Sequence, residues 1–156
     1  MRKCLTAAVA ALSILALAGV AGAAAPAKEK PPVKLKGKVN NKGIGVVSNG
    51  ETDLEADDFY YQKTFEKAKA GTTVKVTIEN EGSTQHTFTI DAQHIDKTIQ
   101  PGAKAKVKVK IPSNGKPVNF YCRFHVDQGM QGVFFTKAGA TVGSKSSSGG
   151  GSSSGY

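Results

Sequence analysis

The stretch VKVTI, residues Val74–Ile78, alternates apolar and polar side chains without interruption. Turn-forming residues bound it on both sides, with an Ala-Gly pair at 70–71 and an Asn-Glu-Gly turn at 80–82. Successive side chains of a β-strand point to opposite faces of a sheet, so this pattern predicts a strand with one buried and one wet face. The clearest structural signal in the chain is therefore β-structure.

Similar short stretches occur at steady intervals on both sides of this one. They are Leu54–Tyr60, His86–Ile90, Ala103–Ile111, Pro117–Cys122 and Gly132–Thr136. Helical periodicity is nearly absent, and only residues 61–70 could hold a helical turn or two. Many short strands separated by turns are typical of an all-β sandwich, which is the fold class that we predict.

The first residues have the three parts of an export signal. A basic start with Arg2 is followed by an apolar run, Leu5–Val20, and by small residues at 21–23. The apolar run is shorter than the roughly 18 residues typical of a membrane span. We expect residues 1–23 to be removed as a signal peptide and residues 24–32 to be a linker. The mature protein should be secreted, periplasmic or associated with the cell envelope, with no membrane span.

The rest of the chain divides into one module and a tail. Residues 33–138 are long enough for a single domain with its own hydrophobic core. Residues 139–156 are mostly Ser and Gly, with too few apolar side chains to offset the entropy of ordering them. We therefore expect one domain, acting as a monomer, followed by a flexible tail.

The charge of the chain is strongly basic, with a formal net value of +9. Removal of Arg2 and Lys3 with the signal peptide would lower it from +9 to +7. The lysines mostly alternate with apolar residues, as in Lys106–Ile111, a pattern typical of the wet face of a strand. Aromatic residues are not interleaved with them as base stacking would need, so we expect no nucleic-acid binding. A basic charge of this size also suits an anionic membrane surface or an acidic protein partner.

A candidate metal site lies in the segment from Phe120 to Met130. With Cys4 in the signal peptide, this segment holds the mature chain's only cysteine, Cys122, and its only methionine, with His125 between them. A thiolate, an imidazole and a thioether together suit copper, and a trigonal His₂Cys set with a weak axial Met is an electron-transfer arrangement.

A second histidine is needed to complete such a site, and His86 can supply it. Strand parity puts His86 on the same face as Phe88 and Ile90, at the start of its predicted strand. That strand can lie beside the one that ends in Cys122. Ligands from two strands and the following loop would come from a rigid frame.

The order His86, then Cys122-x2-His125-x4-Met130, resembles the type 1 copper site of plastocyanins and pseudoazurins in the cupredoxin family. The likeness covers residues 54–136 and includes the turns at 80–82 and 101–102. It implies a cupredoxin-like Greek-key β-sandwich with one type 1 copper per chain. It also implies two nitrogen ligands, His86 and His125, a thiolate ligand, Cys122, and an axial ligand, Met130.

Three positions beside these ligands bear on the resemblance. Tyr121 matches the aromatic position through which some plastocyanins meet a partner. Many members of the family have Asn directly after the first histidine, where this chain has Thr87. Arg123 and Phe124 fill the gap before His125, where plant plastocyanins carry a proline.

The function that we predict is one-electron transfer between redox partners, with the exposed edge of His125 passing the electron. Phe124, Val126 and Met130 could form the apolar surround of this edge. The alternative is an extracytoplasmic copper carrier or store without a redox role, although such proteins often have Met-rich or His-rich surfaces. A copper enzyme would need further ligands, and the chain has three histidines in all. We expect no enzymatic activity and an acidic redox partner, toward which Arg123 would contribute charge.

Two other features could suggest metal binding. His94 lies in a predicted loop, residues 91–100, where a solvated histidine is the simpler interpretation. An acidic cluster at Glu51, Asp53, Glu55, Asp57 and Asp58 lacks the spacing of an EF-hand. We interpret this cluster as a solvated strand edge.

Overall fold

The structure is a computed structural model that describes residues 30–142. The predicted signal peptide, residues 1–23, lies outside the described residues, as do linker residues 24–29 and tail residues 143–156.

The described chain is built almost entirely of β-strands. In chain order these are β1 (Val33–Lys34), β2 (Ile44–Val46), β3 (Glu51–Asp57), β4 (Tyr60–Gln62), β5 (Phe65–Lys67), β6 (Thr73–Asn80), β7 (His86–Ile90), β8 (Ile95–Ile99), β9 (Lys104–Lys110), β10 (Val118–Tyr121), β11 (Gln131–Phe135) and β12 (Ala140–Thr141). Two short 3₁₀ turns interrupt them, η1 (Asp91–Gln93) and η2 (Val126–Gln128).

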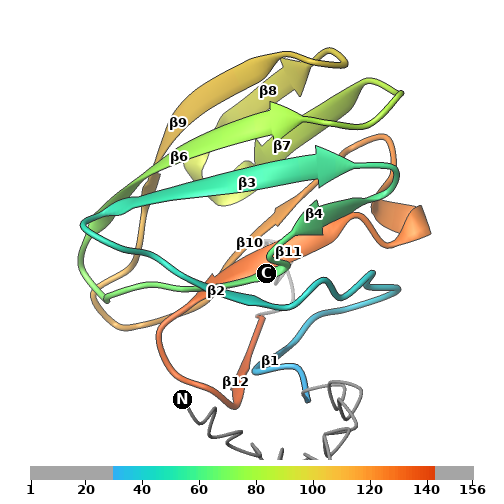
Figure 1. The fold of residues 1–156 in the computed structure, drawn as a ribbon. Helices are drawn as coiled ribbons and strands as arrows, with labels where there is room; N and C mark the ends of the chain where they lie inside the picture. Colours follow the sequence, from blue (N-terminus) through green and yellow to red (C-terminus); the bar gives the residue numbers. More distant parts are fainter. Residues whose placement is uncertain (1–29, 143–156) are drawn as a thin grey trace, which may run out of the picture.

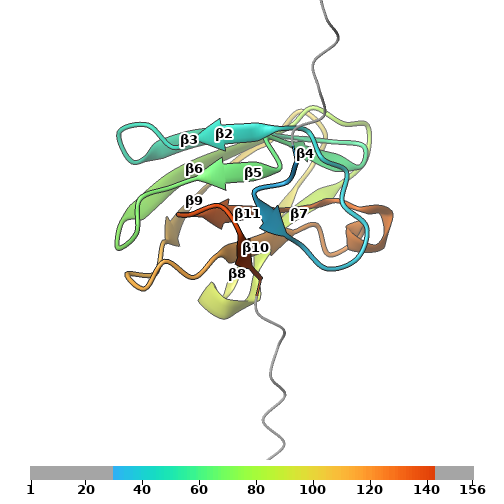
Figure 2. The same ribbon diagram turned by 90° about the horizontal axis from the view of Figure 1, so that it is seen from below.

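The strands form two main sheets that pack face to face (Figures 1 and 2). The first has six strands in the order β2-β5-β11-β10-β7-β8, and the second has four in the order β4-β3-β6-β9. Both sheets are mixed, because β5 pairs in parallel with β2 and β11, and β3 pairs in parallel with β6. The prediction of an all-β sandwich is therefore confirmed.

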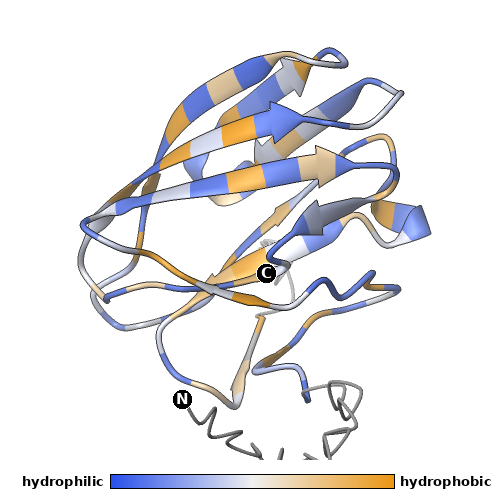
Figure 3. Ribbon diagram, viewed as in Figure 1, coloured by the Kyte–Doolittle hydropathy of each residue, from blue (hydrophilic) through white to orange (hydrophobic). Residues whose placement is uncertain are grey.

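Alternation along the strands accounts for the core between the sheets. On β6, Val74, Val76 and Ile78 are buried, while Thr73 and Lys75 are exposed. Figure 3 shows hydrophobic and hydrophilic residues alternating along the strands of the sheets. Strand β9 pairs with β6 and points Val109 into the core and its lysines outward. Phe88 and Phe120 stack at the centre, with ring centroids 5.0 Å apart. Burying side chains of this size contributes about 1.5–3 kcal/mol each.

A smaller apolar cluster lies on the other side of the six-stranded sheet. Phe65, Val133 and Phe135 of that sheet are covered by Val33 and Leu35. Strand β1 is held there by parallel pairing with β12. Strand β12 falls at the start of the segment that the sequence predicts as a flexible tail, so the folded part extends beyond residue 138.

The expected helical turns at residues 61–70 are wrong, because this segment forms β4 and β5. Its buried side chains include Tyr61 and Phe65, whose spacing of four residues imitates a helical face. Pairing of β5 between β2 and β11 overrides that local pattern. Long-range strand pairing is invisible in a short sequence window.

Two further expectations about the strands need correction. The predicted strand Leu54–Tyr60 is divided, since β3 ends at Asp57 and β4 begins at Tyr60. The predicted loop at 91–100 contains η1 and the strand β8, which pairs with β7 along its whole length. Strand β8 is mostly exposed, so its sequence lacks the regular apolar alternation of a half-buried strand. Between residues 30 and 142, no helix has the length and apolar character needed to span a bilayer.

Candidate metal centre

Two neighbouring strands bring His86 and Cys122 together. Strands β7 and β10 pair in antiparallel fashion, with Thr89 opposite Tyr121. The start of β7 therefore lies beside the end of β10, which places His86 next to Cys122. Both side chains are fully buried. This is the arrangement that strand parity predicted.

The loop after β10 adds His125 to this pair. The Sγ atom of Cys122 lies 3.4 Å from Nδ1 of His125 and 3.9 Å from Nδ1 of His86. The two Nδ1 atoms are 3.1 Å apart. Among the described residues, these three side chains form the group of His, Cys and acidic residues that could hold a metal ion.

The size of this triangle matches that needed around a single metal ion. An ion about 2.0 Å from each nitrogen and about 2.3 Å from the sulfur, at angles of about 120°, requires about 3.5 Å between nitrogens and about 3.7 Å from nitrogen to sulfur. The observed distances differ from these by no more than a few tenths of an ångström. The donor set, with one soft sulfur and two imidazoles, suits copper.

Cys122 is fixed by backbone groups on both sides. Its Sγ accepts a hydrogen bond from the backbone N–H of Thr87 at 3.3 Å. Its own N–H donates to the carbonyl of Met130 at 3.0 Å. The Thr87 hydroxyl accepts the backbone N–H of Arg123 at 2.8 Å. Thr87 therefore steadies the chain after Cys122 from the position where many family members have Asn.

His86 is oriented by a carboxylate that sequence reasoning missed. Its Nε2 lies 3.0 Å from Oδ1 of Asp58, which assigns the ring proton to Nε2 and leaves the Nδ1 lone pair facing Cys122 and His125. Burial lowers the pKa of His86, partly offset by the Asp58 hydrogen bond. The neutral ring that a metal requires is therefore favoured.

Asp58 is itself held as a carboxylate by the turn before β7. Hydrogen bonds from Ser83 hold the pKa of Asp58 well below its usual range, and the Thr84 hydroxyl adds another at 2.7 Å. The only sequence signal for this role is that Asp57-Asp58 interrupts the alternation of the preceding strand.

His125 is the partly exposed member of the triangle. The ring of Phe59 packs against it at a centroid distance of 4.3 Å, and the ring of Phe124 lies at 6.2 Å. Phe124 is 48% exposed, so it contributes apolar surface beside the histidine as expected. Phe59 comes from the β3–β4 turn and was not predicted as a neighbour of the site.

Met130 is fully buried and bonded through its backbone to both neighbouring ligand candidates. Its N–H donates to the carbonyl of His125 at 3.1 Å, and its carbonyl accepts the N–H of Cys122. Its place in the chain is thus fixed relative to the triangle. Its role as axial ligand stays a prediction.

Tyr121 and Arg123 flank Cys122 and are both paired with acidic side chains. The Tyr121 hydroxyl donates to Oδ1 of Asp91 at 2.9 Å. Burial, followed by this hydrogen bond, raises the pKa of Tyr121. Arg123 forms an ion pair with Asp96 of β8. The charge of Arg123 is therefore locally offset.

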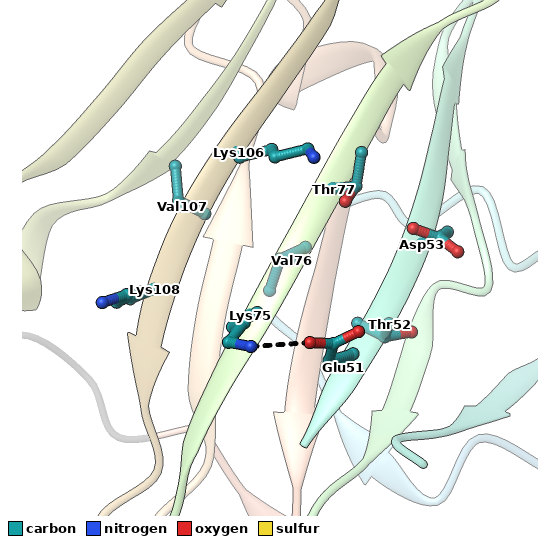
Figure 4. Close-up of a pocket in the computed structure, with 9 residues that line it drawn as sticks. All are labelled: Glu51, Thr52, Asp53, Lys75, Val76, Thr77, Lys106, Val107 and Lys108. Atoms are coloured by element: carbon teal, nitrogen blue, oxygen red, sulfur yellow. Dashed lines mark hydrogen bonds and ion pairs between the residues drawn. The ribbon is translucent and has the colours of Figure 1, made fainter. Parts of the chain in front are cut away.

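The acidic residues of β3 do not form a common metal site. Glu51 and Asp53 point outward from the four-stranded sheet, beside lysines of β6 and β9 (Figure 4). Glu51 is paired with Lys75 at 2.8 Å. Glu51, Asp53 and Glu55 are exposed as expected, but Asp58 is half-buried against His86, and β3 is an inner strand and not an edge. His94 is exposed, follows η1 and is not part of the triangle.

Comparisons with known proteins bear on the family and the fold. A family model described as "Cupredoxin-like domain" matches residues 8–134. No curated protein matches the chain significantly. One similar solved structure is the metal-binding domain of the Cu(I)-exporting P-type ATPase CopA of Streptococcus pneumoniae D39, determined with Cu(I). It is 14% identical to this chain, with a TM-score of 0.51. The match covers 62% of this chain and 97% of that one. This likeness supports the fold alone.

A second solved structure gives a weaker likeness. Dithionite-reduced auracyanin from the photosynthetic bacterium Roseiflexus castenholzii is 18% identical, with a TM-score of 0.49, and the match covers 57% of this chain and 98% of that one.

Proposed function

This chain belongs to the cupredoxin-like domain family, and on that premise we propose that it is an exported type 1 copper protein that carries single electrons between redox partners. The observation that supports this most strongly is the convergence of Nδ1 of His86, Nδ1 of His125 and Sγ of Cys122. Bound copper would supply the one-electron couple, and a trigonal His₂Cys set with a weak axial Met is typical of electron-transfer sites.

Each residue of the candidate site would have a distinct part in this function. His86 and Cys122 are buried in the strand frame, where they would hold the ion in a fixed, dry environment. Met130 would be the axial ligand. His125 is the partly exposed ligand candidate, and the apolar ring of Phe124 beside it would let a partner approach closely.

The test is to add one equivalent of Cu(II) to the purified mature protein and to follow its absorption through cycles of reduction and reoxidation. An electron carrier should turn intensely blue, bleach on reduction and recover fully on reoxidation. A protein that stays colourless and retains Cu(I) would instead be a copper carrier or store, which is the alternative function. Failure to bind either ion would contradict both.

Export is the second part of the proposal. The small residues at 21–23 place the mature N-terminus near Ala23 or Ala24. Mass spectrometry of protein recovered from outside the cytoplasm should find this N-terminus. Recovery of a chain that still carries Met1 or Cys4 would contradict the proposed cleavage.

For the partner we propose an acidic redox protein. Arg123 is paired with Asp96, and Lys104 of β9 is paired with Glu79. The other lysines of β9, at 106, 108 and 110, point outward from this edge strand. We therefore assign the long-range attraction to these lysines more than to Arg123. Such attraction is screened over about 8–10 Å at physiological salt. Electron exchange with an acidic partner should slow as salt rises, and rates that stay flat would contradict this assignment.

A further inference from the structure

A short N-terminal arm, residues 36–41, lies against the loop that carries His125 and Met130. The side chain of Gln131, just after this loop, donates from Nε2 to the carbonyls of Lys36 and Lys38, both at 2.7 Å. The backbone N–H of Asn40 donates to the carbonyl of Gly129 at 3.0 Å. The arm is therefore bonded to the chain on both sides of Met130.

The side chain of Asn40 joins this arm to two other segments. Its Nδ2 donates to the carbonyl of Gln128 at 2.9 Å and to the carbonyl of Phe59 at 2.8 Å. Both amide hydrogens are thus used, one on the ligand loop and one on the β3–β4 turn. These contacts span 88 and 19 positions of the sequence, so they hold together parts of the chain that no local structure would connect.

Both contacts lead directly to the candidate ligands. Gln128 donates its N–H to the carbonyl of His125 and lies two residues before Met130. Phe59 packs its ring on His125. Gly129, between Gln128 and Met130, has a φ of +101°, and a Cβ there would lie 2.9 Å from Oδ1 of Asn40. The loop can therefore approach the Asn40 side chain this closely because residue 129 is a glycine.

We infer that Asn40 is a positioning residue of the metal centre, which fixes the loop bearing His125 and Met130 relative to the buried pair His86 and Cys122. The inference rests on the proposed copper site. A hydrogen-bonded support of this kind typically changes metal affinity 10–100-fold when it is removed. Asn40 would act through the loop, without touching the metal.

The neighbouring residue provides a matched control. Asn41 is exposed, and its Oδ1 accepts a hydrogen bond from the N–H of Gly43 at 2.9 Å, which is a local turn. Asn41→Ala therefore removes the same side chain one position away without touching the ligand loop. Asn40→Asp is a harsher change than Asn40→Ala, because a carboxylate would face two carbonyl oxygens.

The experiment compares wild type, Asn40→Ala, Asn40→Asp and Asn41→Ala, after circular dichroism has shown that each is folded. In the metal-free proteins, hydrogen exchange at the amides of Gly129 and Met130 should rise about tenfold in both Asn40 variants. In the copper-loaded proteins, the copper hyperfine splitting and the absorption band ratio should change, and copper should dissociate about tenfold faster, with Asp worse than Ala. Asn41→Ala should match wild type in every measurement.

Asn40 variants whose copper spectrum and dissociation rate equal those of Asn41→Ala would overturn the inference, even if their melting temperature is lower. A wild-type protein that never turns blue would contradict the proposed function instead. In that case, unchanged exchange at Gly129 and Met130 in Asn40→Ala would still refute the positioning of the loop, and faster exchange would support it.

Discussion

The two halves of the candidate metal centre are held by different kinds of structure. His86 and Cys122 stand at the adjoining ends of paired strands in the middle of a six-stranded sheet. His125 and Met130 stand on a loop whose shape depends on side-chain hydrogen bonds from Asn40 and Gln131. The strand half should therefore be rigid and intolerant of change, and the loop half adjustable. The following predictions test this difference.

The largest effect should come from the buried thiol. Cys122→Ser should abolish the blue absorption, because the intense band requires a thiolate bound to copper. The fold should remain, since the serine hydroxyl can still accept the N–H of Thr87 in the same place. Absorption and far-ultraviolet circular dichroism measure the two effects separately. A blue Cys122→Ser protein would show that the sulfur is not a ligand.

A pair of glycine substitutions compares the two halves directly. His125 is partly exposed and His86 has no exposed surface. Added imidazole should therefore enter the gap left by His125→Gly and restore the blue colour at millimolar concentration. The gap left by His86→Gly lies inside the frame and should not be refilled. Titration of both variants with imidazole checks this, and equal recovery would remove the distinction between the halves.

A smaller effect is expected at the axial position. Met130→Leu should keep copper and colour but raise the reduction potential, because loss of a weak donor to Cu(II) favours the reduced state. We expect the potential to rise by about 59 mV, which is a tenfold change in the equilibrium constant of a one-electron couple. Cyclic voltammetry measures it. Leucine fills a similar volume, so loss of copper altogether would mean that Met130 has a different role.

The last prediction concerns Glu66, a buried carboxyl on β5, which should affect the stability of the strand frame and have the smallest effect on the metal centre. Thr52 donates to its Oε1 at 3.2 Å, Oε2 has no hydrogen-bond partner, and a Cβ on Gly45 would lie 2.6 Å from Oε1. Burial raises the pKa of Glu66 to about 7, although Lys63 and the Thr52 hydrogen bond lower it in part. The folded state thus keeps a proton that the unfolded state releases near pH 4.5.

This raised pKa makes the free energy of unfolding depend on pH. The Glu66 contribution is fully present below about pH 4.5 and is lost as pH rises toward 7, a change of about 3 kcal/mol. Burial lowers the pKa of His86, and this acts on the stability in the opposite direction. The difference between wild type and Glu66→Gln isolates the carboxyl. Urea unfolding at pH 5 and pH 8 should show a smaller loss of stability in Glu66→Gln, and parallel losses would contradict the assignment.

The strand half of the site could be predicted from sequence because alternation fixes which side chains share a face. That is why the pattern at Val74–Ile78 predicted β6, and why parity put His86 on one face with Phe88, at the start of a strand that pairs with the strand before Cys122. Strand β5 was missed because its pairing on both sides is long-range and parallel.

The supports of the site were less predictable than its ligand candidates. Asp58 was interpreted as one of several solvated acids, although it holds His86 in place. Nothing in the sequence around Asn40 marks it as a partner of Gln128 or Phe59, because those contacts depend on the finished fold. Spacing within a motif reveals ligands, whereas the residues that orient them are found from three-dimensional contacts.

X-ray absorption at the copper edge tests the central claim most directly. Protein loaded with one equivalent of Cu(II) should show two nitrogen neighbours and one short copper–sulfur contact, and this sulfur contact should be absent in Cys122→Ser. That result would establish copper between His86, His125 and Cys122. A first shell of nitrogen and oxygen alone in the wild-type protein would contradict the account.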